Sequence, residues 1–368
     1  MSGQPSPASP PAAATNGRRV FLGLVAAVAC LRLYYCACLP VNTGDVLRHL
    51  AWGCVVNESG YAAADRSLAD NRPAAAWVAW SDLPFNYPIG LLFFDQLIAR
   101  AWGSIFFMKL VLTLLEGLSA LLVYRHTREK WLAFMYWASP ISIWWCSHEG
   151  QIEPLQNVLA IAAVSMLERR LFWAGLLLAL AVQIKLTAVF FLPLFLRVRM
   201  GRTKFIECAA GGLVGTLPTV FACMSYSALT NLSNLPLRLN PYYFNPFEHS
   251  LFLGSSVWLT LVDQLATYGA LIALSARMIH DKNLMRYVPA VSFFVALKFA
   301  HHAQPWYMLL ATSFFLALDD RRLRFWLFLL APLLDVWSLL QMIVGPFGYT
   351  IGGYYDGLTV GGDMCKAL

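Results

Sequence analysis

Long apolar runs separated by short basic clusters are the feature that most constrains this chain. A helix of about 20 apolar residues crosses the roughly 30 Å hydrocarbon core of a bilayer. Eleven runs can be marked: 20–39, 104–124, 131–146, 155–167, 171–183, 186–196, 205–227, 256–278, 287–300, 306–318 and 325–344. Several are shorter than a full span. Because only 13% of the residues are charged, against about a quarter in soluble domains, the pattern predicts an all-α polytopic membrane protein with about 11 transmembrane helices.

The basic residues occupy every second link between these runs. Seventeen of the 27 basic residues fall in the N-terminal segment and alternate links: Arg18, Arg19, Arg125, Arg128, Lys130, Arg169, Arg170, Arg197, Arg199, Arg202, Lys204, Arg277, Lys282, Arg286, Arg321, Arg322 and Arg324. The positive-inside rule places these links and the N-terminus in the cytoplasm. The net charge of +7 is therefore spread over short loops, and no nucleic-acid partner is expected.

This alternation divides the chain into a tail, one membrane domain and a second tail. Residues 1–17, rich in Pro, Ala and Ser, are expected to form a disordered cytoplasmic tail. Residues 18–344 form a single transmembrane domain that begins with a retained signal anchor. Within it, 40–103 is a long outer loop containing amphipathic helices, with 87–103 expected to lie on the membrane. Residues 345–368 form an outer C-terminal tail.

The eight cysteines are scattered along the chain and include no C-x-x-C pair with a downstream partner. This spacing supports neither a zinc site nor a disulfide framework, so no metal ligands are predicted and most cysteines are expected to pack as small apolar residues. A single bridge between Cys54 and Cys365, outside the cytoplasm, is an open alternative.

Unusual polar residues gather at the predicted outer edge, where each is a candidate for a functional site. They are Asp45, the segment 147–153 with His148, Glu149, Gln151 and Glu153, then Lys185, and finally Lys298, His301, His302 and Gln304. Glu116, Asp95, Asp263 and Asp335 are instead expected to make polar contacts between helices. The cytoplasmic edge shows only basic loops, so any reaction centre is predicted on the outer side.

A carboxylate and several cations at one depth suit transfer of a sugar from a lipid phosphate. Such transfer needs a base for the acceptor hydroxyl, and Asp45 can supply it. It also needs positive charge where the phosphate departs, which Lys185, His301 or His302 can supply. Simpler roles stay open: Asp45 as a helix cap, Lys185 as a snorkelling side chain, the histidines as an interface pair, and the glutamates as part of a hydrated loop.

Five motifs in order resemble the GT-C superfamily of integral-membrane glycosyltransferases over residues 20–340. They are Asn42-Thr-Gly-Asp45, Phe85-Asn-Tyr-Pro88, Gly150-Gln-Ile-Glu153-Pro-Leu-Gln-Asn157, Ala181-Val-Gln-Ile-Lys185-Leu with Pro193 beyond it, and His302-Ala-Gln304-Pro-Trp-Tyr307. The chain is most similar to GPI mannosyltransferase I and to bacterial polyprenyl-phosphate-mannose transferases. Many relatives carry Asp-x-Asp, whereas Thr43 stands at the first position here, which weakens the case for a bound metal.

The resemblance implies inverting transfer of a sugar, mannose in the nearest subgroup, with direct attack by an acceptor hydroxyl. Asp45 would be the catalytic base. Lys185, His301, His302 and Gln304 would bind the donor phosphate, and Tyr87, His148, Glu149, Gln151, Glu153 and Trp306 would bind substrate. No cofactor is expected, and metal dependence stays open. The expected partners are a polyprenyl- or dolichyl-phosphate sugar, a lipid-linked or glycan acceptor and membrane lipids, with a small membrane-protein subunit as a further candidate.

Two other functions are alternatives to sugar transfer. A transporter or lipid flippase would favour repeated halves and ionisable groups near the midplane, whereas this chain shows no internal repeat and has a long acidic outer loop. A non-catalytic subunit of a transferase complex would lack the base that Asp45 offers. The ER membrane and a bacterial plasma membrane both fit.

Overall fold

A computed structural model of the chain describes residues 12–40, 44–76, 78, 81–82, 84–85, 87–167, 169–185, 188, 201–225, 309, 315–316, 320–330, 340 and 361–367. The helices in this part are α1 Ala12–Ala37, α2 Gly44–Ser59, α3 Leu68–Asn71, α4 Ile89–Trp102, α5 Ile105–Thr127, α6 Lys130–Trp137, α7 Pro140–Ser142, α8 Glu153–Met166, α9 Leu171–Ile184, α11 Arg202–Ser225, α16 Arg321–Leu330 and α18 Met364–Ala367. Short 3-10 turns cover Tyr61–Asp65 and Pro73–Ala75, and a π-helical turn covers Ile143–His148. No residue of the described ranges is in a β-strand, so the predicted all-α class is confirmed there.

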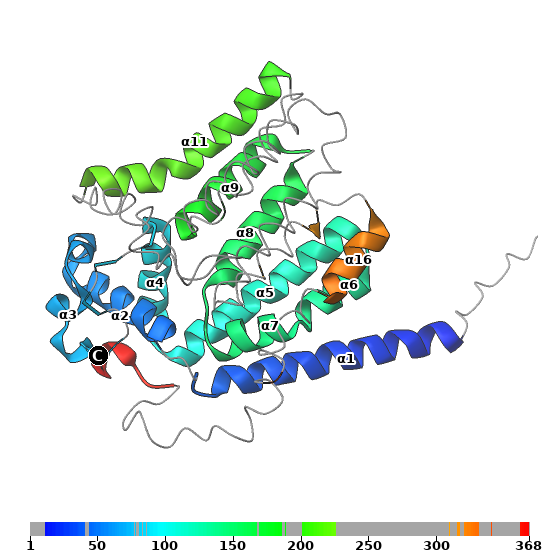
Figure 1. Ribbon diagram of the computed structural model, residues 1–368, viewed down its shortest axis with the longest axis horizontal. Helices are drawn as coiled ribbons and strands as arrows, with labels where there is room; N and C mark the ends of the chain where they lie inside the picture. The colour runs from blue at the N-terminus through cyan, green and yellow to red at the C-terminus, as the bar shows by residue number, and fades with distance from the viewer. Residues whose placement is uncertain are drawn as a thin grey trace, which may run out of the picture.

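The longer helices form a bundle with a smaller helical group at one end. Helices α11, α9, α8, α5 and α6 lie side by side in that order, and α1 runs along the bundle's edge (Figure 1). The end of α1 leads into α2 and α4, which pack on each other and, together with α3, form the smaller group. This group sits where α5 and α8 begin and α9 ends, so several helix termini converge on it.

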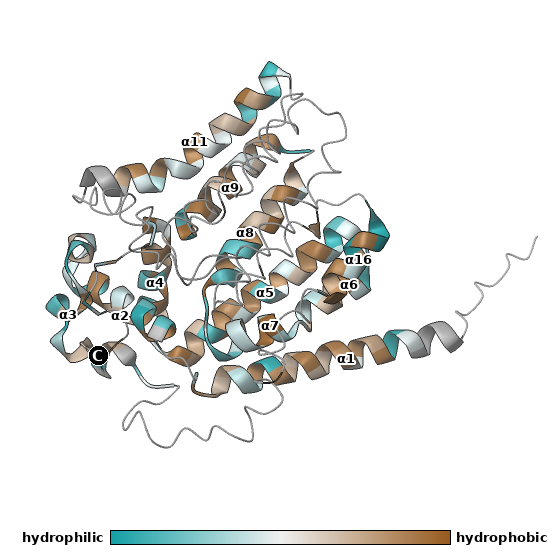
Figure 2. Cartoon of the chain, in the orientation of Figure 1, coloured by the Kyte–Doolittle hydropathy of each residue, from teal (hydrophilic) through white to brown (hydrophobic). Residues whose placement is uncertain are grey.

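Two described helices, α1 and α5, are long and apolar enough to cross a bilayer. Figure 2 shows hydrophobic colour along most of both. Helices α8 and α9 coincide with the predicted runs 155–167 and 171–183 but have only 14 residues each. Most of the predicted runs 186–196, 256–278, 287–300, 306–318 and 325–344 lie outside the described residues. The count of 11 spans therefore remains a prediction.

Helices α9 and α11 run in the same direction. A Cβ on Gly211 would meet Phe172 near the start of α9, and the Thr219 hydroxyl donates to Gln183 Oε1 at its end over 2.5 Å. Glycines on both helices let the two backbones approach closely, as small residues do between membrane helices. The predicted topology also requires α9 and α11 to be parallel, because the predicted run 186–196 would cross the membrane between them in the opposite direction.

The predicted span 131–146 is not one continuous helix in the structure. Helix α6 ends at Trp137, α7 begins at Pro140, and the π-helical turn follows. Proline has no N–H and disfavours helical backbone in the residue before it, which explains the break at Ser139. The buried Arg32 guanidinium of α1 donates to the carbonyl oxygen of Trp137 at 2.6 and 3.0 Å and to Ser142 Oγ at 2.8 Å. Arg32, which interrupts the first apolar run, thus satisfies a carbonyl at the break.

Other boundaries also differ from the sequence-based expectation. Helix α1 begins at Ala12, inside the segment predicted as a disordered tail. The predicted amphipathic segment 87–103 is helical from Ile89 to Trp102, and its Asp95 is buried against α2, as a polar contact between helices should be. Residues 44–59 of the predicted outer loop, for which the sequence indicates no helix bounds, form the 16-residue helix α2.

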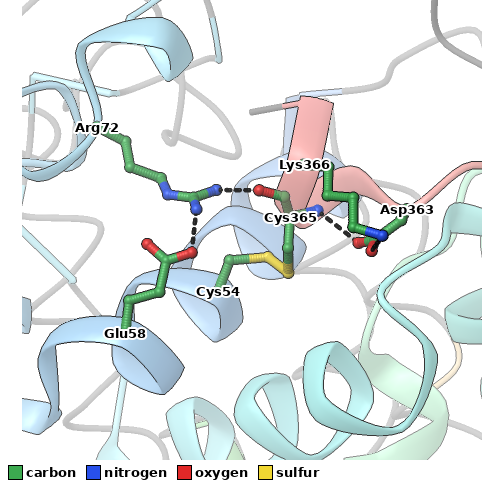
Figure 3. Close-up of a disulfide and its surroundings, with 6 residues drawn as sticks. All are labelled: Cys54, Glu58, Arg72, Asp363, Cys365 and Lys366. Carbon is green, nitrogen blue, oxygen red and sulfur yellow. Dashed lines mark hydrogen bonds and ion pairs between the residues drawn. A yellow bond between two sulfur atoms is a disulfide. The ribbon is translucent and has the colours of Figure 1, made fainter.

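The C-terminal segment is tied to α2 by the bridge that the sequence left open. Cys54 and Cys365 form a disulfide across 311 residues of sequence (Figure 3). Arg72 lies beside it, donating to the Cys365 carbonyl oxygen over 3.1 Å and pairing with Glu58. Three other cysteines, Cys36, Cys146 and Cys208, are buried and free, as expected of packing residues. The C-terminal tail is therefore attached to the helix that carries Asp45.

Candidate functional site at the start of helix α2

Asp45 lies in the first turn of α2 and is almost fully buried, with 7% of its surface exposed. Arg48, one turn later on the same helix, donates from Nη2 to Asp45 Oδ1 over 3.0 Å. Gln151, 106 residues away in sequence, donates from Nε2 to Asp45 Oδ2 over 2.9 Å. Each carboxylate oxygen thus accepts a side-chain hydrogen bond, and Asp45 joins α2 to the segment before α8.

These contacts keep Asp45 ionised despite its burial. Burial alone raises the pKa of a carboxyl group, because the charged form loses hydration. The charge of Arg48 and the hydrogen bond from Gln151 oppose burial, together with the nearby charges of His49 and Lys185, and the net effect lowers the pKa of Asp45. Asp45 is therefore a carboxylate, able to accept a proton, at neutral pH.

The position of Gln151 depends on a sharp turn at Gly150. Gly150 has a φ of +76°, in the left-handed region that favours glycine. A Cβ at this position would come within 2.9 Å of Val46 Cγ2 and 3.2 Å of Lys109 Cγ. A side chain there would press on the residue next to Asp45, so glycine allows the turn to approach α2.

Glu153 and Lys185 form a second buried ion pair beside Asp45. Glu153 opens α8, and Lys185 follows the last residue of α9, so the antiparallel pair α8 and α9 brings the two side chains to one end of the bundle. Lys185 Nζ donates to Glu153 Oε1, and Gln156 Nε2 donates to the Lys185 carbonyl oxygen over 2.7 Å. Lys185 is buried, so a simple snorkelling role does not describe it.

Tyr87 completes the group from the link that precedes α4. Its hydroxyl lies 2.9 Å from Arg48 Nη2, the same nitrogen that donates to Asp45. The guanidinium carbon of Arg48 also lies 5.1 Å from the centre of the Tyr87 ring, within the range of a cation–π contact. Tyr87 therefore contacts the base candidate through Arg48.

His148 and Glu149 form a pair of their own at the end of the π-helical turn. His148 Nδ1 lies 2.7 Å from Glu149 Oε1, and the imidazole stacks on the Trp144 ring with centroids 4.1 Å apart. Burial, helped by the charge of Lys109, lowers the pKa of His148, although Glu149 opposes it. The pair is buried next to the turn that carries Gln151, but no described hydrogen bond joins it to Asp45.

The structure thus brings together Asp45, Tyr87, Gln151, Glu153 and Lys185 of the predicted site residues. His301, His302, Gln304 and Trp306 lie outside the described residues. Sequence reasoning missed Arg48, which it counted only among the few basic residues of an outer loop. The signal was its spacing: three residues after Asp45, it faces the carboxylate only if the segment is helical.

No group of three or more His, Cys, Asp or Glu side chains in the described portion is arranged to hold a metal ion. The polar atoms around Asp45 come from an arginine, a glutamine and a lysine instead, two of them cations. Such donors suit an anionic ligand, a phosphate above all, because guanidinium and ammonium groups bind its oxygens directly.

One comparison with known proteins identifies the family of this chain. The family model of glycosyltransferase family 87 matches residues 85–300, which is more than half of the chain and includes Tyr87, Gln151, Glu153 and Lys185. The chain matches no curated protein and no solved structure. The match favours a membrane glycosyltransferase over the transporter or flippase alternative. The chain belongs to glycosyltransferase family 87.

Proposed function

We propose that this chain transfers a sugar from a polyprenyl- or dolichyl-phosphate donor to a hydroxyl group of a lipid-linked or glycan acceptor, with inversion at the anomeric carbon. The observation that carries the proposal is the buried Asp45 carboxylate, held between Arg48 and Gln151 and facing Lys185. In one site this combines a proton acceptor with cations for a departing phosphate.

Asp45 acts as the general base. The acceptor hydroxyl oxygen attacks the anomeric carbon, and the hydroxyl proton passes to Asp45. The bond from the anomeric carbon to the phosphate oxygen breaks, and its electron pair stays on that oxygen. A lowered pKa makes Asp45 a weak base. The transition state at an anomeric carbon resembles an oxocarbenium ion, which draws electrons from the incoming oxygen, so the hydroxyl becomes acidic as the bond forms.

Arg48 and Lys185 receive the leaving phosphate. A phosphate leaves as an anion and needs no proton, so one carboxylate is enough and the second requirement is fixed positive charge. Arg48 adjoins Asp45 directly, and Lys185 is held at the end of α9 by Glu153. His301, His302 and Gln304 are proposed as further donor-phosphate ligands, and His148, Glu149 and Trp306 as substrate contacts.

A lipid-linked donor fits the position of the site at one end of the apolar bundle. Both α1 and α5 are long enough to span a bilayer, and α1 ends beside the site while α5 begins beside it. A phosphate at the bilayer surface could therefore reach Arg48 while its polyprenyl chain stays among lipids. Mannose is the proposed sugar because the motifs most resemble those of mannose users. The proposed site faces away from the cytoplasm, in keeping with the basic links at the other end of the helices and with a disulfide on α2.

The substitution Asp45→Asn tests the assignment. It removes the base while keeping size and one hydrogen-bond acceptor, so transfer from a polyprenyl-phosphate sugar should fall by at least about 100-fold, the lower end of general-base contributions. Asp82→Asn is the matched control, because Asp82 is an exposed carboxylate of the same predicted outer loop. The Cys54–Cys365 bridge, seen as a mobility shift on reduction, reports folding of both variants. Near-normal turnover by a folded Asp45→Asn protein contradicts the role of Asp45.

A further inference from the structure

A second buried acid lies behind the site and is not used by the proposed reaction. Asp95, on α4, places Oδ2 at 3.0 Å from Nδ1 of His49, which follows Arg48 on α2. Only 1% of either residue is exposed. The two helices are pressed together here, since a Cβ on Gly53, one turn after His49, would collide with the Asp95 carbonyl oxygen. The close approach of α2 and α4 therefore sets this hydrogen bond.

The imidazole of His49 connects the pair to the site. Its centroid lies 5.2 Å from that of the Tyr87 ring, at an interplanar angle of 53°. Arg48 Nη2 donates a hydrogen bond to the Tyr87 hydroxyl, and the same nitrogen donates to Asp45. A contiguous series of contacts thus runs from Asp95 through His49, Tyr87 and Arg48 to Asp45.

Packing alone does not account for an acid at this position. Asp95 Oδ1 is buried and accepts no hydrogen bond within the described residues, and burial raises the pKa of Asp95 although His49 opposes it. A buried carboxyl group with an unsatisfied oxygen costs stability that an apolar side chain would not cost. The charge of Asp95 also acts on Arg48, and that of His49 on Asp45.

We propose that Asp95 and His49 are a positioning pair for the transfer reaction: Asp95 holds the His49 ring against Tyr87, and Tyr87 thereby fixes the Arg48 guanidinium on Asp45. The pair touches neither donor nor acceptor. The claim rests on the proposed function, but its geometric part concerns only how Asp95 controls Asp45.

The chain offers variants that separate the parts of this pair. Asp95→Leu removes the acceptor, whereas Asp95→Asn keeps one. His49→Phe keeps a ring against Tyr87 but loses the N–H, and His49→Asn keeps an N–H but loses the ring. The control is Gln96→Ala, on the same helix, which removes the acceptor that Tyr61 uses over 2.5 Å and so tests general loosening of α4.

Kinetics give the first readout. Asp95→Leu and both His49 variants should lower kcat roughly 10-fold, the lower end of effects seen for residues that orient a ligand through another group, with the donor KM changed less than threefold. Asp95→Asn should recover most of the loss, and Gln96→Ala should behave as the wild type. Equal losses in Asp95→Leu and Gln96→Ala, or a rise in KM without a fall in kcat, overturn the positioning role.

The titration of Asp45 gives a readout that needs no turnover. Infrared difference spectra of protein with isotope-labelled aspartate, compared with Asp45→Asn, identify the Asp45 carboxylate band. The groups facing Asp45 are Arg48 and His49 from α2, Gln151, and Lys185 after α9. If Asp95→Leu lets Arg48 move away, the band should titrate at least one pH unit higher than in the wild type. An unshifted band refutes the proposal whether or not the protein transfers sugar, while a shifted band in a protein without transferase activity refutes only the proposed function.

Discussion

Replacing Gly150 by alanine tests how the turn before α8 holds Gln151 on Asp45. Gly150 has a φ of +76°, and an added Cβ would lie 2.9 Å from Val46 Cγ2. Left-handed backbone costs an alanine about 1–2 kcal/mol, and overpacking a close contact adds about 1–3 kcal/mol. We expect the turn to relieve the contact by moving away from α2, which lengthens the 2.9 Å bond from Gln151 to Asp45.

The chain contains a second glycine at positive φ for comparison with this substitution. Gly60 has the same φ of +76°, but a Cβ there meets nothing within 4 Å. Gly60 has a ψ of 175°, in a region that essentially only glycine adopts, so Gly60→Ala strains the backbone without the collision. For Gly150→Ala, overpacking of the turn on α2 should lower the free energy of unfolding by about 1–3 kcal/mol, in addition to the backbone strain.

Activity should separate the two glycine variants more sharply than stability. A hydrogen bond to a charged group contributes about 1.5–3 kcal/mol, so losing Gln151 from Asp45 in the transition state should lower kcat by roughly 10- to 100-fold. Gly60→Ala should keep near-normal kcat. The assay is sugar transfer by purified protein, alongside thermal unfolding in the same detergent. Equal kcat values for the two variants would refute the claim that the Gly150 turn positions Gln151.

Three further outcomes follow from the same contacts. The folded-state pKa of Asp45 is lowered, so ionised Asp45 stabilises the fold fully above the unfolded pKa of about 3.9, and this stabilisation is lost as pH falls through the folded pKa. The melting temperatures of wild type and Asp45→Asn should therefore converge only in acid. A difference in melting temperature that stays constant down to pH 2 would contradict this. Lys185→Met should destabilise the fold by about 3–5 kcal/mol, because it leaves Glu153 buried and unpaired, and adding Glu153→Leu should restore part of the loss; simple additivity of the two changes argues against the pair. Cys54→Ser, or reduction of the wild type, should lower the free energy of unfolding by about 2–4 kcal/mol. Cys54→Ser should also remove the gel mobility shift that reduction produces in the wild type. A shift that persists in Cys54→Ser would exclude the bond to Cys365.

The hydropathy pattern predicted the helical class well because its signal is strong and local. The runs 20–39 and 104–124 correspond to α1 and α5, whose bounds differ from the prediction mainly at their ends. The run 131–146 failed because hydropathy does not register backbone geometry: Ser139-Pro140 interrupts the helix although the apolar residues continue. Pro140 was the visible signal, and it outweighs apolar continuity.

The candidate site was predicted in part, because polar residues in an apolar chain are conspicuous while their partners are not. Asp45, Gln151 and Lys185 stood out by position, and the structure brings them together. Arg48 and His49 did not, because the sequence indicates no helix bounds for 44–59 within the predicted outer loop. On a helix, their positions are set relative to Asp45. The bridge from Cys54 to Cys365 spans 311 residues, and no local pattern indicates a pairing over that distance.

The proposed reaction is tested most directly by following the donor itself by mass spectrometry. Purified protein is incubated with polyprenyl-phosphate mannose and a panel of lipid-linked and glycan acceptors, with nucleotide-linked mannose as the competing donor. The lipid-linked donor should be consumed, free polyprenyl phosphate should appear in equal amount, and the product should carry the inverted anomeric linkage. Asp45→Asn should leave the donor intact. Consumption of the nucleotide sugar with the lipid donor untouched, or equal turnover by Asp45→Asn, would contradict the proposed reaction.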